Sequence, residues 1–292
     1  VGILGELSLG HAGFMSLGAF SGVVASFLLA EAIPFAPLRL ALSMAVGAVF
    51  GAAGGVIVGV PVLRLQGDYL AIVTLAFGQI IKNIIMVLYV GVDGEGFHMA
   101  LSSERFHLAE EGTAIIKGPM GAVGVQKLAS FTAGFVLILI TLLVVQNLVN
   151  SRSGRAIMAL RDNRIAAESV GINVTKYKLM AFVTSAALAG AAGALFGLNY
   201  SSTVASKFDF NSSILVLVFV VLGGLGSIRG SIIAAAVLYV LPELLRQFNI
   251  SDYRMLIYAI ILILVMLVTN NDQLKTLAGR IIPKRKGAAS HG

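Results

Sequence analysis

Long runs without a charged residue are the feature that most limits the fold of this chain. Only 12% of its 292 residues are charged. Four long stretches between these charged residues contain no charge at all: 7–30, 40–63, 128–151 and 179–206. A helix rises about 1.5 Å per residue and a bilayer core is about 30 Å thick, so each run can cross a membrane. This pattern excludes a soluble enzyme. It also disfavours a membrane β-barrel, whose strands alternate apolar and polar residues.

Shorter uncharged segments follow the same pattern at 69–81, extended to about 92 if Lys82 is tolerated, and at 210–228, 230–242 and 255–271. We therefore expect an all-α, polytopic transmembrane helical bundle of about eight spans, some of them short or broken. Residues 1–272 would form the membrane domain and residues 273–292 a basic tail. Because the chain opens at Val1, directly in apolar sequence, we also expect N-terminal sequence to be missing.

The distribution of Lys and Arg predicts sidedness. The loop 152–178 and the tail 273–292 are both strongly basic, so both should be cytoplasmic. An even number of crossings must then separate them, which requires the segment 210–246 to cross twice. Counting backwards places the loop 92–127 outside, where five acidic residues outnumber three basic ones, and residue 1 inside.

Several kinds of chemistry are disfavoured. The net charge of +7 arises from basic residues in the loops and the tail, which is the bias expected on the cytoplasmic side of a membrane protein. It therefore does not indicate a surface that binds nucleic acid. There are no cysteines and no P-loop or nucleophile-elbow motif, and the four histidines lack metal-ligand spacing. We expect no catalysis, no metal site and no cofactor bound by this chain.

Small residues recur every four positions in two spans. One set is Gly47, Gly51, Gly55 and Gly59, and the other is Ser185, Ala189, Gly193 and Gly197. Small residues let helix backbones approach closely in lipid, where little hydrophobic force brings helices together. Bundle packing is the favoured interpretation, and a sliding face for a gate is the alternative. The cluster Gly223, Gly224 and Gly226 predicts a helix break.

Polar residues inside the spans are few, and carboxylates are nearly absent from them. Lys82 shares a helical face with Gln79 and Asn83. In one interpretation these three residues line a polar cavity. In the other, the Lys82 side chain extends to the membrane–water interface or pairs with a structural partner. His11 is either bonded to a backbone carbonyl or on a solute path. His11, Gln79, Lys82 and Asn83 are therefore the candidates for a translocation path.

The loop 152–178 contains good helix formers at 156–169, followed by Gly171 where a helix end favours positive φ. We expect one basic helix of about fourteen residues beneath the membrane. A docked partner is the favoured interpretation, and a helix on lipid headgroups is the alternative.

Four ordered segments carry a resemblance to a known family: Leu7–Phe14, Leu65–Gly78, Arg161–Ile172 and Leu222–Gly230. The chain resembles, over nearly its whole length, the LivM-like permease subunits of bacterial branched-chain amino acid ABC importers. That family usually has one or two more N-terminal hydrophobic segments, so the full helix count would exceed eight. The outer loop also differs, because about 25 residues at 92–117 precede its glycine-rich turn.

The resemblance implies a multi-pass subunit of the bacterial inner membrane. Its implied partners are a second homologous permease, two cytoplasmic ATPases that bind ATP-Mg, and an extracytoplasmic amino-acid-binding protein. Coupling to the ATPases would involve Arg161, Asp162, Asn163, Ala166, Ala167, Glu168 and Gly171.

Alternative functions remain open on the sequence. A urea or short-chain amide permease of the same superfamily is the nearest, although the match to the family over Gly67–Gly78 favours amino acids such as leucine, isoleucine or valine. An ion-coupled secondary carrier or channel would work without an ATPase, and a non-transporting scaffold would move no solute at all.

Overall fold

A computed structural model of the chain describes residues 2–63, 65, 67–94, 96–106, 112–247 and 260. The chain forms two compact units, Val1–Leu215 and Val216–Gly292. The predicted span at 255–271, apart from Ile260, and the predicted tail lie outside the described residues. The α-helices are α1 His11–Leu28, α2 Ala36–Val62, α3 Asp68–Val87, α4 Phe131–Asn150, α5 Arg152–Asp162, α6 Arg164–Ser169, α7 Val174–Gly197, α8 Phe210–Leu222 and α9 Ile228–Gln247.

Six helical segments in the described part are long and apolar enough to cross a membrane. They comprise α1, α2, α3, α4, α7 and the segment Ala205–Leu222 that contains α8. The helix α9 adds a shorter apolar stretch, Ile228–Val240. The polytopic helical bundle is confirmed, with six candidate spans among the described residues against about eight expected over the whole chain.

The first and fifth spans differ in their bounds from those expected. Residues 7–10, counted as part of a span, are not helical, and α1 begins at His11. Conversely, residues 174–178, assigned to the basic loop, form the first turn of α7. Absence of charge marks which residues can lie in lipid, but it does not mark where hydrogen bonding begins a helix.

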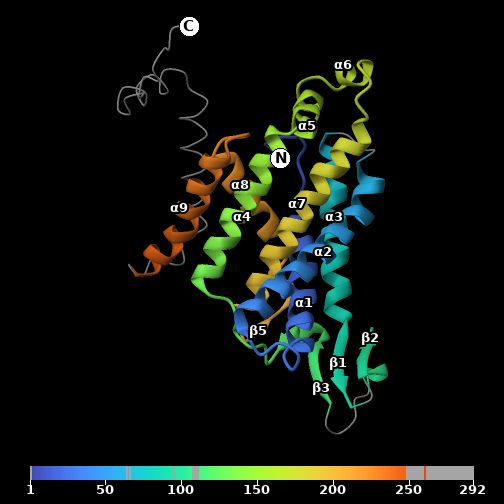
Figure 1. The fold of residues 1–292 in the computed structure, drawn as a ribbon, viewed down its shortest axis with the longest axis vertical. Coiled ribbons are helices and arrows are strands. Elements are labelled where there is room, and N and C mark those ends of the chain that lie inside the picture. Colours follow the sequence, from blue (N-terminus) through green and yellow to red (C-terminus); the bar gives the residue numbers. More distant parts are fainter. Residues whose placement is uncertain are drawn as a thin grey trace. The chain divides into compact units, whose positions relative to one another are not determined.

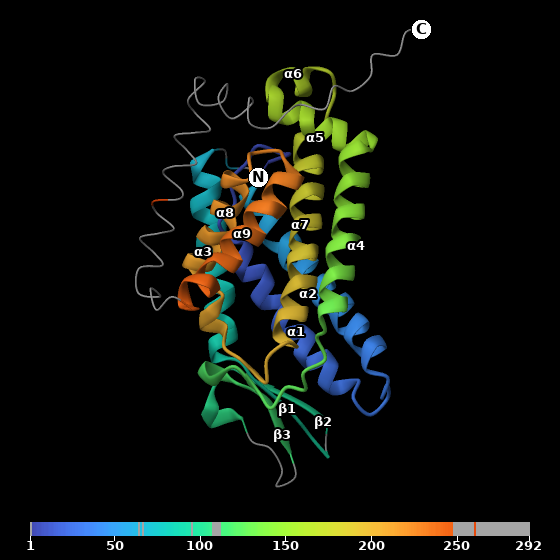
Figure 2. The ribbon, with the colours of Figure 1, turned by 90° about the vertical axis from the view of Figure 1, so that its left-hand side faces the viewer.

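The first unit is organised around close contacts between α1, α2 and α7 (Figure 2). A Cβ atom added at Gly18 of α1 would lie 2.1 Å from the carbonyl oxygen of Gly190 in α7. At Gly51 of α2 it would lie 2.5 Å from the carbonyl oxygen of Ala186. Backbone therefore meets backbone at these crossings, which is how small residues permit helix association in lipid.

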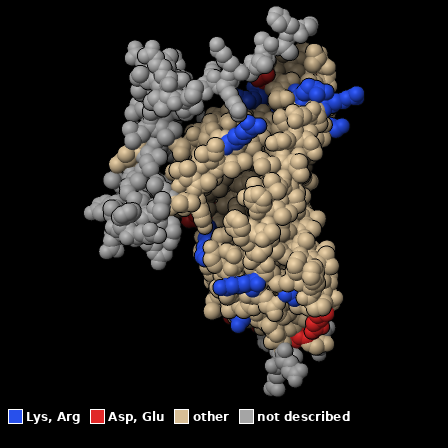
Figure 3. All heavy atoms as spheres, turned by 60° about the vertical axis from the view of Figure 1, so that its left-hand side comes forward, with Lys and Arg blue, Asp and Glu red and all other residues tan. Residues whose placement is uncertain are grey.

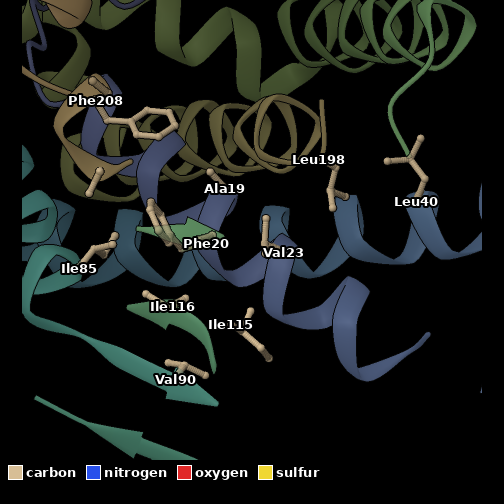
Figure 4. Close-up of a cluster of buried hydrophobic side chains, with 13 residues drawn as sticks. Ala19, Phe20, Val23, Leu40, Ile85, Val90, Ile115, Ile116, Leu198 and Phe208 are labelled. Atoms are coloured by element: carbon tan, nitrogen blue, oxygen red, sulfur yellow. The ribbon is translucent and has the colours of Figure 1, made fainter. Parts of the chain in front are cut away.

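A cluster of buried apolar side chains joins this bundle to the segments at its outer end (Figure 4). The helix α1 contributes Ala19, Phe20 and Val23, and other elements close around them. These other members include Leu40, Ile85, Val90, Ile115, Ile116, Leu198 and Phe208. Burying them stabilises the packing of α1 against strands as well as helices.

Four strands in the loop between α3 and α4 and one strand after α7 form a small antiparallel sheet. Its five strands, in the order β2-β1-β3-β4-β5, are β1 Tyr89–Asp93, β2 Gly96–Ala100, β3 Thr113–Lys117, β4 Ala122–Val123 and β5 Ser202–Thr203. Short 3₁₀ helices lie at Ser103–Arg105, Gly118–Met120 and Ala205–Lys207. Val90 and Ile116 are buried, so one face of the sheet packs on the helical core. The pairing of β4 with β5 joins this loop to the chain after α7.

The two ends of the first unit carry different features (Figure 1). The N-terminal residues lie with α5 and α6 at one end, and β1, β2 and β3 lie at the other. Figure 3 shows Lys and Arg side chains gathered at the end with α5 and α6 and again near the opposite end, with an uncharged band between. The side of the membrane that each end faces stays a prediction.

The predicted helix break after α8 is present. The helix α8 ends at Leu222 and α9 begins at Ile228. Gly224 and Gly226 between them both have φ of +91°, a conformation that glycine adopts without a Cβ penalty.

Candidate functional site

The helices α5 and α6 lie outside the spans, and together they replace the single helix expected at 156–169. The helix breaks at Asn163, whose φ of −156° is extended. The Asn163 side-chain oxygen accepts a hydrogen bond from the Ala166 N–H at 3.1 Å, which caps α6. Asparagine satisfies a free helix amide well, so this one residue starts a new helix inside a run of helix formers.

The end of α6 has the geometry predicted for Gly171. Its φ is +84°, and its N–H donates to the carbonyl of Glu168 at 3.0 Å. The next N–H, of Ile172, donates to the carbonyl of Ala167 at 3.1 Å. These two bonds form a Schellman motif, which satisfies the last carbonyls of α6 and turns the chain into α7.

A small apolar cluster holds the two helices against the start of α7. Its buried members are Leu160 of α5, Ala167 of α6 and Val174 of α7. Because Ala167 belongs to this cluster, it is not part of the exposed surface on which we expected it. The cluster makes α5, α6 and the first turn of α7 one packed unit, which we call the α5–α6 unit.

The outer surface of the α5–α6 unit combines apolar and charged groups. Ile165 is 77% exposed and Val170 is 76% exposed. The other predicted coupling residues at this surface are exposed as well: Arg161, Asp162, Asn163, Ala166 and Glu168. Glu168 forms a pair with Arg164 at 3.6 Å. Large apolar side chains exposed beside charges on a short helix are typical of a protein-binding surface.

The four predicted path residues lie in two places. Gln79 and Lys82 are half-buried on α3 and Asn83 is exposed there. His11 is the first residue of α1 and is half-buried.

The first turn of α1 lies against the middle of α3. A Cβ atom at Gly10 would lie 2.3 Å from the carbonyl oxygen of Thr74, and one at Gly13 would lie 2.7 Å from the Cα of Gly78. His11 is therefore flanked by two contacts with α3, the second of them next to Gln79.

Only some of the small residues predicted to pack lie at contacts between helices. Gly47, Gly51, Gly55 and Gly59 are all buried on α2, and Gly193 and Gly197 are buried on α7. Ser185 is exposed, however, and the central position on α7 is Gly190, which the four-residue spacing missed. At the break after α8, a Cβ on Gly223 would lie 2.3 Å from the Ser231 amide nitrogen, so α8 and α9 meet closely there.

Two contacts of the N-terminal segment were also missed. The Glu6 carboxylate pairs with the ammonium of Lys178, and Arg161 donates to the carbonyl of Gly2 at 2.9 Å. Both contacts join residues that are far apart along the chain, for which the sequence offers no local signal. Within the described residues, no group of His, Asp and Glu side chains is arranged to hold a metal ion.

Comparison with known proteins identifies the family. Residues 1–266 match the family described as branched-chain amino acid transport system / permease component. The chain is 34% identical over 278 residues to the high-affinity branched-chain amino acid transport system permease protein LivM of Salmonella typhimurium, covering 91% of this chain and 63% of that protein. The LivM protein of Escherichia coli K12 is also 34% identical, with the same coverage.

More distant relatives extend the comparison. The ribose import permease protein RbsC of Haemophilus influenzae is 26% identical, covering 91% of this chain and 76% of that protein. The chain therefore spans less than two thirds of the LivM relatives but more of RbsC. No solved structure shows a significant match. With six apolar helices in its described part and a family match over residues 1–266, the chain is a multi-pass inner-membrane protein that belongs to the family of branched-chain amino acid transport permease components.

Proposed function

We propose that this chain is the membrane-spanning subunit of an ATP-driven importer for branched-chain amino acids. Its partners would be a second related permease, two cytoplasmic ATPase subunits that bind ATP-Mg, and an extracytoplasmic binding protein that delivers the solute. The LivM relatives support the substrate class, and relatives named LivH, 34% identical over 118 residues, support a second permease of similar sequence. The chain itself would carry out no catalysis.

The observation that carries the proposal is the exposed surface of the α5–α6 unit. It presents Ile165 and Val170 beside charged groups at the end of the bundle away from the sheet. A lipid-headgroup helix would be expected to turn its apolar side chains toward α7 and the membrane, but here the buried side is already filled by Leu160 and Ala167. The remaining apolar side chains are therefore available to a protein partner.

The function is tested by reconstituting the purified complex in vesicles and measuring uptake. Leucine, urea and ribose should be compared, since a urea permease was the nearest alternative and ribose permeases are among the relatives. We expect ATP-dependent uptake of leucine that urea and ribose do not compete. Uptake of urea or ribose in place of leucine would contradict the substrate class, and uptake that persists with an inactive ATPase but needs an ion gradient would contradict the transporter class.

We expect Glu168→Arg to reduce leucine uptake while the protein stays in the membrane in normal amount. The exchange reverses a charge on the exposed surface and places it beside Arg164. Exposed ion pairs contribute only about 0–1 kcal/mol, so folding should be little affected. Glu168→Gln is the matched control, because it removes the pair without adding repulsion. Equal uptake by Glu168→Arg and the unmodified protein would argue against this surface as the ATPase contact.

A further inference from the structure

The residues that precede α1 connect three elements of the first unit. Residues 2–10 are not helical, and we call them the N-terminal strap. At one end the strap contacts α5, where Arg161 donates to the carbonyl of Gly2 and packs on Gly5. Gly5 has φ of +77°, and a Cβ there would lie 2.9 Å from Cγ of Arg161. The turn at Gly5 is therefore shaped to the arginine side chain.

The middle of the strap is attached to α7 by charge. Lys178 lies in the first turns of α7 and its side chain is only 5% exposed, while that of Glu6 is 17% exposed. A buried cation is costly unless an anion compensates it, and Glu6 supplies the carboxylate. Removing either partner leaves the other charge uncompensated in a poorly solvated place.

The far end of the strap is attached to α3 and continues into α1. The Leu9 N–H donates to the hydroxyl of Thr74 at 3.1 Å, and Gly10 packs directly on the Thr74 carbonyl. One residue later α1 begins, and its Ala12 N–H donates to the hydroxyl of Ser213 in α8 at 3.3 Å. The strap therefore contacts α5, α7 and α3, and the first turn of α1 that follows it contacts α8.

We infer that the N-terminal strap transmits displacement of the α5–α6 unit to α1 and α3, with Arg161, Glu6 and Lys178 as its positioning residues. The inference rests on the proposed function, because the displacement would come from the ATPases. The apolar cluster at Leu160, Ala167 and Val174 lies within the α5–α6 unit, whereas the strap is a separate connection that reaches α3 and the start of α1. When α5 moves, its contacts with Gly2 and Gly5 displace the strap. The strap in turn displaces the start of α1.

The test measures leucine moved per ATP hydrolysed by the complete complex in vesicles. Glu6→Gln and Lys178→Met should each lower this ratio by about fivefold or more, the scale of coupling between distinct sites. The charge exchange Glu6→Lys with Lys178→Glu should restore much of it. Lys127→Met is the control, since Lys127 is exposed and lies between β4 and α4, outside both the strap and the α5–α6 unit, and its ratio should be unchanged.

A structural role alone would lower the amount of folded protein and leave the ratio unaltered, so that result would overturn the inference. An exchange variant no better than the single variants would do the same. If the buried-pair variants fail to fold, Gly5→Ala decides: Gly5 is exposed, and an alanine there is expected to lower the ratio by displacing Arg161, whereas a normal ratio contradicts the strap. Absence of leucine uptake by the unmodified protein would contradict the proposed function and the strap together.

Discussion

Replacing Gly190 with alanine should destabilise the protein by about 2 kcal/mol, although alanine favours helices. The new Cβ would lie 2.2 Å from the carbonyl oxygen of Gly47 and 3.0 Å from the Cα of Gly51. Overpacking costs about 1–3 kcal/mol, and the upper end applies because the obstacle is the main chain of α2, which cannot rotate away. The gain in helix propensity, about 1 kcal/mol, is smaller. Thermal unfolding in detergent measures the difference.

The matched control for this prediction is Gly134→Ala in α4. The nearest atom to its new Cβ is Cδ2 of Leu195 at 3.8 Å, an ordinary contact. Only the helix propensity changes, so this variant should be as stable as the unmodified protein or more stable by up to about 1 kcal/mol. Equal melting temperatures for the two variants would show that the contact of α7 with α2 is looser than described.

Gly171→Val should abolish most of the uptake without removing the protein from the membrane. The space around the Gly171 Cα is open, with no atom within 4 Å of an added Cβ, so the effect comes from the backbone alone. A β-branched residue is strained at φ of +84°, with a cost of about 1–2 kcal/mol or more. The Schellman motif would open and α6 would lose its orientation. Uptake of labelled leucine, with the amount of complex measured in the same vesicles, tests this.

Gly171→Asn separates conformation from side-chain size in the same position. Asparagine adopts the left-handed region more readily than other residues, so this variant should keep most of the uptake. If valine and asparagine have the same effect, an added side chain and not the turn would be responsible. If neither has an effect, α6 does not couple to an ATPase.

Features that depend on local sequence were predictable. The long apolar spans, the break after Leu222 and the positive φ of Gly171 follow from charge, glycine clustering and helix ends, each readable over a short segment. The N-terminal residues lie with α5 and α6 at one end of the first unit, and the assignment of that end to the cytoplasm by the Lys and Arg count stays a prediction.

Features that depend on contacts between distant residues were not predictable. The pair Glu6–Lys178 joins positions 172 residues apart. One strand of the sheet, β5, lies after α7 but pairs with β4, before α4, and short strands carry a weak pattern on their own. Residues spaced four apart drift around a helix that has 3.6 residues per turn, so they do not all lie on the face of α7 that contacts α2. The predicted spacing therefore missed Gly190.

Asn163 illustrates a different difficulty. The residues on both sides of it favour a helix, and the sum over the window predicts one continuous element. The hydrogen bond from the Ala166 N–H to the Asn163 side chain instead starts a second helix at this point. Propensity averaged over a segment does not register one cap inside it.

The position of α7 between its neighbours has a consequence for biosynthesis. The helix α2 ends at Val62 and α7 begins at Val174, so the glycine faces of α1 and α2 leave the ribosome long before the helix that covers them. At about 5–20 residues per second, the delay until α7 is complete is on the order of ten seconds. During that interval the glycine residues of α1 and α2 that later contact α7 face lipid or the insertion machinery, so their close packing can form only after α7 has been made.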